Sequence, residues 1–225
     1  MKLVRLLTLL PILIFLSSCL DSAQFSDEKR VSLLFNVQNV GTALEIEENV
    51  VTITEFKFTI DRFTLSSEDG FSVGTQDRIT ALIFSYDEDI ENSNLVIDVG
   101  LGFSDNIVFF NYQMFLEPPV SRTGVFDDDF FSDNENYSIV MIGEINGSEF
   151  MYRSTGKFEK TFNFEPARLS DTNETLVIRK SFNIADLLTD EEGNFIDPTV
   201  ESNDQVLVNK LNMLLEVTAS AEDIF

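Results

Sequence analysis

The sequence predicts an all-β protein, an antiparallel β-sandwich or a related barrel, with a short helix near its C-terminus. Most of the chain alternates apolar and polar residues, which is the period of a β-strand. Turn-forming residues such as Pro118-Pro119 and Asn146-Gly147 separate these segments. Apolar residues make up 44% of the chain, enough to bury a core, and Phe supplies 22 of the aromatic side chains. We therefore expect a Phe-rich core.

Each predicted strand follows from a local pattern. Residues 31–37 form the first one. Residues 51–65 alternate with two changes of phase, which predict β-bulges or a bent strand. Asn146-Gly147 lies between strands at 137–144 and 149–154 and predicts a hairpin, because a type I′ turn needs positive φ at both central residues. Further strands are predicted at residues 78–86, 94–99, 107–116, 158–164 and 176–184.

Two segments interrupt the strand pattern. Residues 184–188 fit a single helical turn. Ser202 and Gln205 fit a capping box, with Ser202 as the N-cap and Gln205 at the N3 position. Apolar residues then recur at helical spacing as far as Leu215, which predicts a short amphipathic helix over 203–216. A final edge strand over 213–219 is the alternative.

The composition excludes several chemistries. The chain has no His, no Trp and one Cys. Without His there is no imidazole base, no Ser-His or Cys-His nucleophile and no His metal ligand. A single Cys makes neither an intramolecular disulfide nor a thiolate zinc site. The net charge is −24, and such a charge repels phosphate backbones, so we expect no nucleic-acid binding.

The N-terminus has the pattern of a secretory signal. Lys2 and Arg5 precede an apolar run at 6–15, which is about half the length of a membrane-spanning helix. Leu16-Ser17-Ser18-Cys19 then resembles the lipobox of bacterial lipoproteins. The resemblance implies that residues 1–18 are removed and that Cys19 becomes the N-terminus, carrying a diacylglycerol and usually an N-linked acyl chain, with palmitate as a typical acyl group.

Such an anchor implies a location. Several acyl chains hold a protein at a membrane surface without spanning the bilayer. Leu20, rather than Asp, follows Cys19, and the sorting rule of these lipoproteins then favours the outer membrane. Residues 19–30 are expected to be the acylated Cys and a flexible tether, and 31–225 a single β-sandwich domain. Loss of residues 1–18 removes two basic residues and leaves a net charge of −26.

Two acidic loops are candidate calcium sites. Calcium takes six to eight oxygen ligands, which flexible acidic loops supply. A solvated surface loop at 127–136 and a plain turn at 190–197 are the alternatives. The candidate ligands are Asp127, Asp129 and Asp133 in the first loop, and Asp190, Glu192, Asn194 and Asp197 in the second.

The body of the chain weakly resembles uncharacterised β-rich envelope lipoproteins in residues 51–65, 145–150 and 193–198. That class implies no activity. We expect a non-enzymatic, lipid-anchored protein that binds or scaffolds a partner in the envelope or at the cell surface. Phe130 and Phe131 are candidate anchors for an envelope protein partner, unless the pair packs back onto the sandwich.

Two other functions remain open. A structural subunit of a surface fibre or envelope complex would use an edge strand that pairs with a neighbour. A hydrolase with paired carboxylates ranks third, because pairs of acidic residues are inevitable in a chain with 39 of them.

Overall fold

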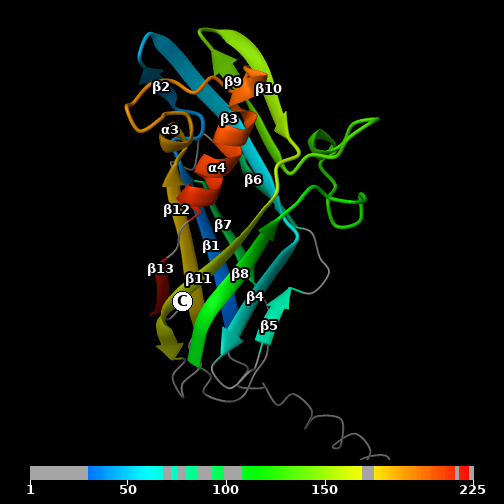
Figure 1. The fold of residues 1–225 in the computed structure, drawn as a ribbon, viewed down its shortest axis with the longest axis vertical. Helices are drawn as coiled ribbons and strands as arrows, with labels where there is room; N and C mark the ends of the chain where they lie inside the picture. The colour runs from blue at the N-terminus through cyan, green and yellow to red at the C-terminus, as the bar shows by residue number, and fades with distance from the viewer. Residues whose placement is uncertain are drawn as a thin grey trace, which may run out of the picture.

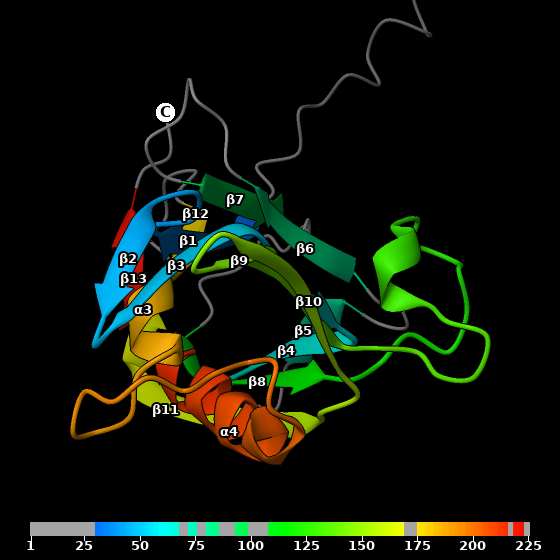
Figure 2. The same cartoon turned by 90° about the horizontal axis from the view of Figure 1, so that it is seen from above.

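The computed structural model describes residues 30–67, 72–75, 80–85, 93–98, 108–168, 175–215 and 218–222. Cys19, the signal segment and the tether up to residue 29 lie outside these residues. Three β-sheets surround a shared interior, and helix α4 covers one side of it (Figures 1 and 2). The predicted all-β fold with a short C-terminal helix is confirmed.

The first sheet contains a parallel pair. β1 and β12 run in the same direction, with Arg30 opposite Thr175 and Gln38 opposite Asn183. The other strand pairs of the described residues are antiparallel, as predicted. A parallel pair needs a crossover connection, which local patterns do not reveal. The order is β13-β12-β1-β7, with bounds Arg30–Gln38 (β1), Ser93–Asp98 (β7), Thr175–Asn183 (β12) and Thr218–Glu222 (β13).

β3 is the centre of the second sheet. It pairs with β9 on one side and with β2 and β6 on the other. The register shifts between Ile53 and Glu55, which confirms the first predicted bulge. The path is β10-β9-β3-β2, with bounds Ala43–Ile46 (β2), Asn49–Ile60 (β3), Thr80–Ser85 (β6), Ile139–Ile145 (β9) and Ser148–Ser154 (β10).

The third sheet begins where the second phase change was predicted. Asp61 separates β3 from β4, and its backbone N–H donates to the Phe115 carbonyl, 2.9 Å away, so the chain passes from one sheet to the next. β2 and β5 were not predicted, because four residues hold too little alternation. The order is β11-β8-β4-β5, with bounds Arg62–Ser67 (β4), Ser72–Thr75 (β5), Val108–Leu116 (β8) and Phe158–Arg168 (β11).

The helices follow the prediction except at one cap. The helical turn α3 spans Ile184–Leu187 and α4 spans Asp204–Leu214. The capping box is wrong: Ser202 lies inside a 3₁₀ turn, η2 (Glu201–Asn203), that runs directly into α4. The chain is already helical before α4, so no extended N-cap residue is available. The helices within the described residues are too short or too polar to cross a membrane.

Aromatic rings fill the interior, as the composition predicts. The Phe58 ring lies 5.6 Å from Phe56, 5.8 Å from Phe35 and 5.9 Å from Phe84, measured between centroids. Their strands belong to two sheets, so this cluster joins them. α4 adds buried side chains to the same core, namely Leu207, Val208 and Leu211.

Candidate functional site at the free edge of β10

β10 is an edge strand that lacks two common protections of a sheet edge. Among the described strands it pairs with β9 and with no other. It has seven residues and no proline, whereas short strands and prolines are common protections of sheet edges. β2, at the opposite end of this sheet, has four residues. β10 is therefore the better template for another strand.

The hairpin geometry decides which backbone groups of β10 face outward. Asn146 and Gly147 have φ of 54° and 77°, which confirms the predicted type I′ turn. Ser148 lies opposite Ile145 and Tyr152 opposite Met141. In a two-residue hairpin the residues next to the turn form a hydrogen-bonded pair, and such pairs alternate along the strands. Met151 and Arg153 consequently direct their backbone N–H and C=O groups away from β9.

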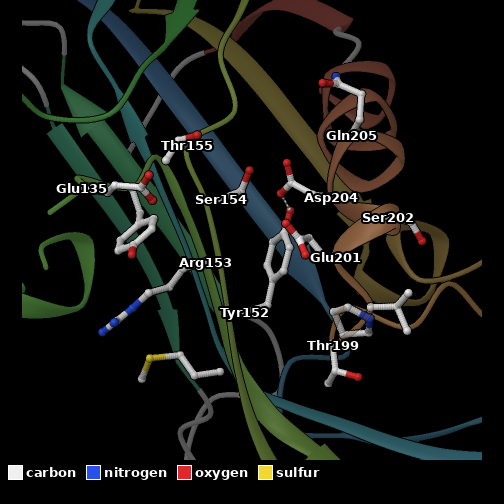
Figure 3. A pocket seen from close by; sticks show the side chains of 14 residues that line it. Glu135, Tyr152, Arg153, Ser154, Thr155, Thr199, Glu201, Ser202, Asp204 and Gln205 are labelled. Atoms are coloured by element: carbon white, nitrogen blue, oxygen red, sulfur yellow. Dashed lines mark hydrogen bonds between the residues drawn. The ribbon is translucent and has the colours of Figure 1, made fainter.

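A cleft of about 620 Å³ runs along this edge (Figure 3). Five consecutive residues of β10 and the segment after it, 151–155, line the cleft. Consecutive strand residues point to opposite faces of a sheet. A hollow that contacts all of them therefore lies against the strand's edge and its backbone. No hydrogen bond among the described residues occupies the outward N–H or C=O of Met151 or Arg153.

Residues 198–205 form one wall of the cleft. Asp197 begins this segment: its Oδ1 accepts hydrogen bonds from the Thr199 backbone N–H at 2.8 Å and from Oγ1 at 2.7 Å. The Tyr152 hydroxyl donates to Asp204 Oδ1 at 2.8 Å, which ties the wall to β10 (Figure 3). Burial raises the pKa of Tyr152, and Asp204 raises it further, so the hydroxyl stays protonated and remains the donor.

The loop between β8 and β9 forms the opposite wall, through Glu135 and Tyr137. Arg153 connects this loop to β10. Its guanidinium lies 5.3 Å from the centroid of the Tyr137 ring and 3.6 Å from Asp129 Oδ1. In Figure 3 the Arg153 side chain points away from Asp204.

A buried lysine fastens the same loop to the outer face of the sheet. Lys57 Nζ lies 2.7 Å from Asp129 Oδ2, 2.9 Å from Asp127 Oδ2 and 2.5 Å from Glu55 Oε2, and the Lys57 side chain is 5% exposed. Burial alone would lower the pKa of Lys57, but these carboxylates outweigh it and raise the pKa. The ammonium therefore stays charged and holds the loop in place.

A second hollow of about 510 Å³ begins beside the cleft, and Met151 lines both. It lies over Ile142, Gly143 and Phe150. A side chain at position 143 would place its Cβ 2.1 Å from the Thr52 carbonyl oxygen, so glycine is required for β9 to approach β3 this closely. Met151 is 47% exposed and contributes an apolar side chain to both hollows.

The first predicted calcium loop is brought together only in part. Asp127 and Asp129 meet on Lys57, whereas Asp133 lies on the exposed Ser132–Glu135 turn. No cluster of three potential metal ligands occurs among the described residues. Calcium binding in this loop stays a prediction, and the Lys57 ammonium already supplies a positive charge to two of its candidate ligands.

The second predicted calcium loop forms a turn. Asp190 accepts from the Glu192 and Asn194 backbone N–H groups, at 3.0 and 2.7 Å, and from Asn194 Nδ2 at 2.8 Å. These bonds, led by the one from the Asn194 side chain, lower the pKa of Asp190. Asp197 faces Thr199 instead. Calcium binding here also stays a prediction.

Of the two alternatives for Phe130 and Phe131, the structure favours the one in which the pair packs back onto the sandwich, so Phe130 is not an exposed anchor. Phe130 is fully buried in a small core with Val125 and Val140 on the outer face of the sheet. Phe131 is half-buried beneath the Arg122 guanidinium, 4.6 Å from the ring centroid. Phe126 is the exposed aromatic residue of this loop, at 88%. No local pattern in the sequence indicates which phenylalanine turns inward.

The fold and the site together define an all-β protein with a cleft along the free edge of one sheet. No known protein family and no curated protein matches the chain. Among solved structures, MbnP from Methylosinus trichosporium is similar over 68% of this chain and 76% of its own, with a TM-score of 0.41 and 10% identity. This likeness is too distant to bear on function.

Proposed function

We propose that this protein is a non-enzymatic, lipid-anchored binding protein of the bacterial cell envelope that captures an extended polypeptide segment on the free edge of β10. One observation carries the proposal: a cleft follows the outward backbone groups of Met151 and Arg153 along an unprotected edge strand. In strand addition, main-chain hydrogen bonds supply affinity and flanking pockets supply specificity. The outward backbone groups of Met151 and Arg153 offer the hydrogen bonds, and the cleft and the second hollow offer the pockets.

The position of the site suits a protein tethered by its N-terminus. β1 rises from the lower end of the molecule in Figure 1, and the β9–β10 turn lies at the upper end. The residue at which the tether joins the domain, Arg30, therefore lies at the opposite end of the described structure from the β9–β10 turn. We place the protein at the outer membrane on the strength of Leu20 beside Cys19.

The lipid anchor is tested by replacing Cys19 with Ser. In cells fed an alkyne-labelled fatty acid, the unaltered protein is expected to carry the label and to fractionate with membranes, because several acyl chains make attachment effectively permanent. Cys19→Ser should remove the label, whereas Ser18→Ala, which retains the thiol, should keep it. Equal labelling of the protein and the Cys19→Ser variant would contradict the anchor.

Strand addition is tested by blocking the edge without altering the β9 ladder. Proline at position 151 removes an outward N–H that β9 does not use, and prolines are tolerated at such edge positions. A displayed library of short peptides is selected on the purified protein. We expect the selected peptides to bind the Met151→Ala control and to lose at least about tenfold in affinity for Met151→Pro, since backbone bonds carry the interaction.

Hydrogen exchange gives a second measurement that does not depend on the proline variant. A peptide added to β10 should slow exchange of the Met151 and Arg153 amides and leave the Tyr152 amide, which already faces β9, nearly unchanged. Selected peptides that bind both variants equally, with no added protection at 151 and 153, would overturn the proposal.

A further inference from the structure

We infer that the segment captured by β10 is basic, with Lys or Arg at alternate positions and apolar residues between them; the inference rests on the proposed function. An added strand continues the alternation of the sheet, so one set of its side chains shares a face with Tyr152 and the other shares a face with Met151. The two faces of the cleft differ in chemistry, and each face selects the side chains of the added strand that point toward it.

The face of Tyr152 is acidic. Glu201 and Asp204 come from the wall opposite Tyr152 (Figure 3). Glu201 is exposed, so its carboxylate is free to meet an incoming cation. Asp204 also lines the cleft, and its Oδ1 accepts a hydrogen bond from the Tyr152 hydroxyl. Side chains that enter on this face therefore meet two carboxylates.

Arg153 is the one cationic side chain among the described residues that line the cleft, and it does not offset these charges. Arg153 is directed toward Asp129 and the Tyr137 ring, on the side away from Asp204. Glu135 adds a third carboxylate to the lining, and Glu144 and Glu149 border the second hollow. An acidic segment would meet like charges along the whole edge, whereas a basic one would find complementary charge.

The other face of the edge is apolar at its centre. Met151 is half exposed between the two hollows, and Ile142, its partner on β9, lines the second hollow on the same face. Methionine adapts its shape to different neighbours, which suits an apolar side chain of a bound segment. Alternating basic and apolar residues therefore match both faces at once.

A second copy of this chain fits the edge less well. Antiparallel pairing of two β10 strands would set Glu149 opposite Arg153, but that arginine already contacts Asp129. Each copy would also bring a net charge of −24, and the repulsion between two such bodies opposes their association. The charge of this chain thus favours a foreign, basic segment.

Three labelled peptides of about nine residues, long enough to span β10, test the inference. They alternate Val with Lys, Thr or Glu, and their affinities for the purified protein are measured by fluorescence anisotropy. We expect the Lys peptide to bind about tenfold more tightly than the Thr peptide and the Glu peptide more weakly than both. The Lys advantage should shrink as salt rises from about 0.05 to 0.3 M, because salt screens exposed charges.

Two double variants that remove the same charge show whether the preference for the Lys peptide comes from the carboxylates of the cleft. Glu135→Gln with Glu201→Gln should reduce the advantage of the Lys peptide to about threefold. Glu45→Gln with Glu48→Gln removes the same charge from exposed residues at the β2 edge and should leave the advantage intact. An equal loss in both double variants would overturn the inference, because a general attraction to the acidic chain would then explain the preference.

The remaining outcomes separate this inference from the proposed function. Equal binding of all three peptides, abolished by Met151→Pro, would overturn the charge preference and keep strand addition. A dimer in analytical ultracentrifugation that Met151→Pro dissociates would assign the edge to a second copy and overturn the basic segment. Failure of every peptide, with no peptide selected from the library, would overturn the proposed function itself.

Discussion

Replacing Phe58 with Ala is expected to lower the free energy of unfolding by about 4 kcal/mol, because a phenyl ring is removed from a site that cannot collapse. Phe58 is fully buried, and its ring packs against Phe35, Phe56 and Phe84 from three strands. The cavity would open at the junction of the first and second sheets. Urea denaturation at neutral pH measures the change.

Two controls show whether the loss arises from the cavity. Phe58→Leu keeps most of the volume and should cost about 1 kcal/mol. Phe126→Ala makes the same chemical change at a residue that is 88% exposed and should alter stability by less than about 0.5 kcal/mol. Similar losses for Phe58→Ala and Phe126→Ala would contradict the packing described for the core.

Replacing Lys57 with Ala should cost about 3 kcal/mol, since removing one partner of a buried charge network leaves the others uncompensated. Glu55, Asp127 and Asp129 would remain close together without a cation between them. Their side chains are 17% to 38% exposed, so water moderates the loss. Lys157→Ala is the control: that lysine is 63% exposed beside Glu117, and exposed pairs contribute about 0 to 1 kcal/mol.

The contribution of Lys57 to the free energy of unfolding should decrease at alkaline pH. Its pKa in the folded protein is raised above the ordinary value of about 10.4. A raised lysine pKa stabilises the folded state fully below the unfolded-state value, and this stabilisation is lost as the pH rises toward the folded-state value. The difference between wild type and Lys57→Ala should therefore be constant from pH 7 to about pH 9 and shrink above about pH 10.4. A difference that grows in that alkaline range would contradict the role of the ammonium.

The Lys57 variant also tests how the cleft is built. Asp129 contacts both Lys57 and Arg153, so loss of the lysine should loosen the wall that contains Glu135 and Tyr137. The small core around Phe130 would keep part of the loop on the sheet. This coupling follows from tertiary contacts, because Lys57 is some seventy positions from Asp127 and Asp129 in the sequence.

The strands of the candidate site were predictable, but the site was not. Period-2 alternation and Asn146-Gly147 predict β9 and β10, since both signals depend on neighbouring residues. The sequence contains no local sign that β10 lies at an edge, because an edge is defined by the absence of a partner strand. Glu201 and Asp204 lie at the junction of η2 and α4, where the sequence pattern predicted a capping box at Ser202 instead. Their position beside Tyr152 was therefore not predicted.

Local patterns predict the all-β class, the type I′ hairpin, the Phe-rich core and the C-terminal helix, and the composition excludes histidine chemistry. All of these depend on residue types or on spacings of a few residues. Tertiary structure decided the parallel pairing of β1 with β12, the free edge of β10, the burial of Phe130 and the neutralisation of two acidic candidates by Lys57. The physical reason is the same in each case: these features arise from contacts between segments far apart in the chain, and no local periodicity records them.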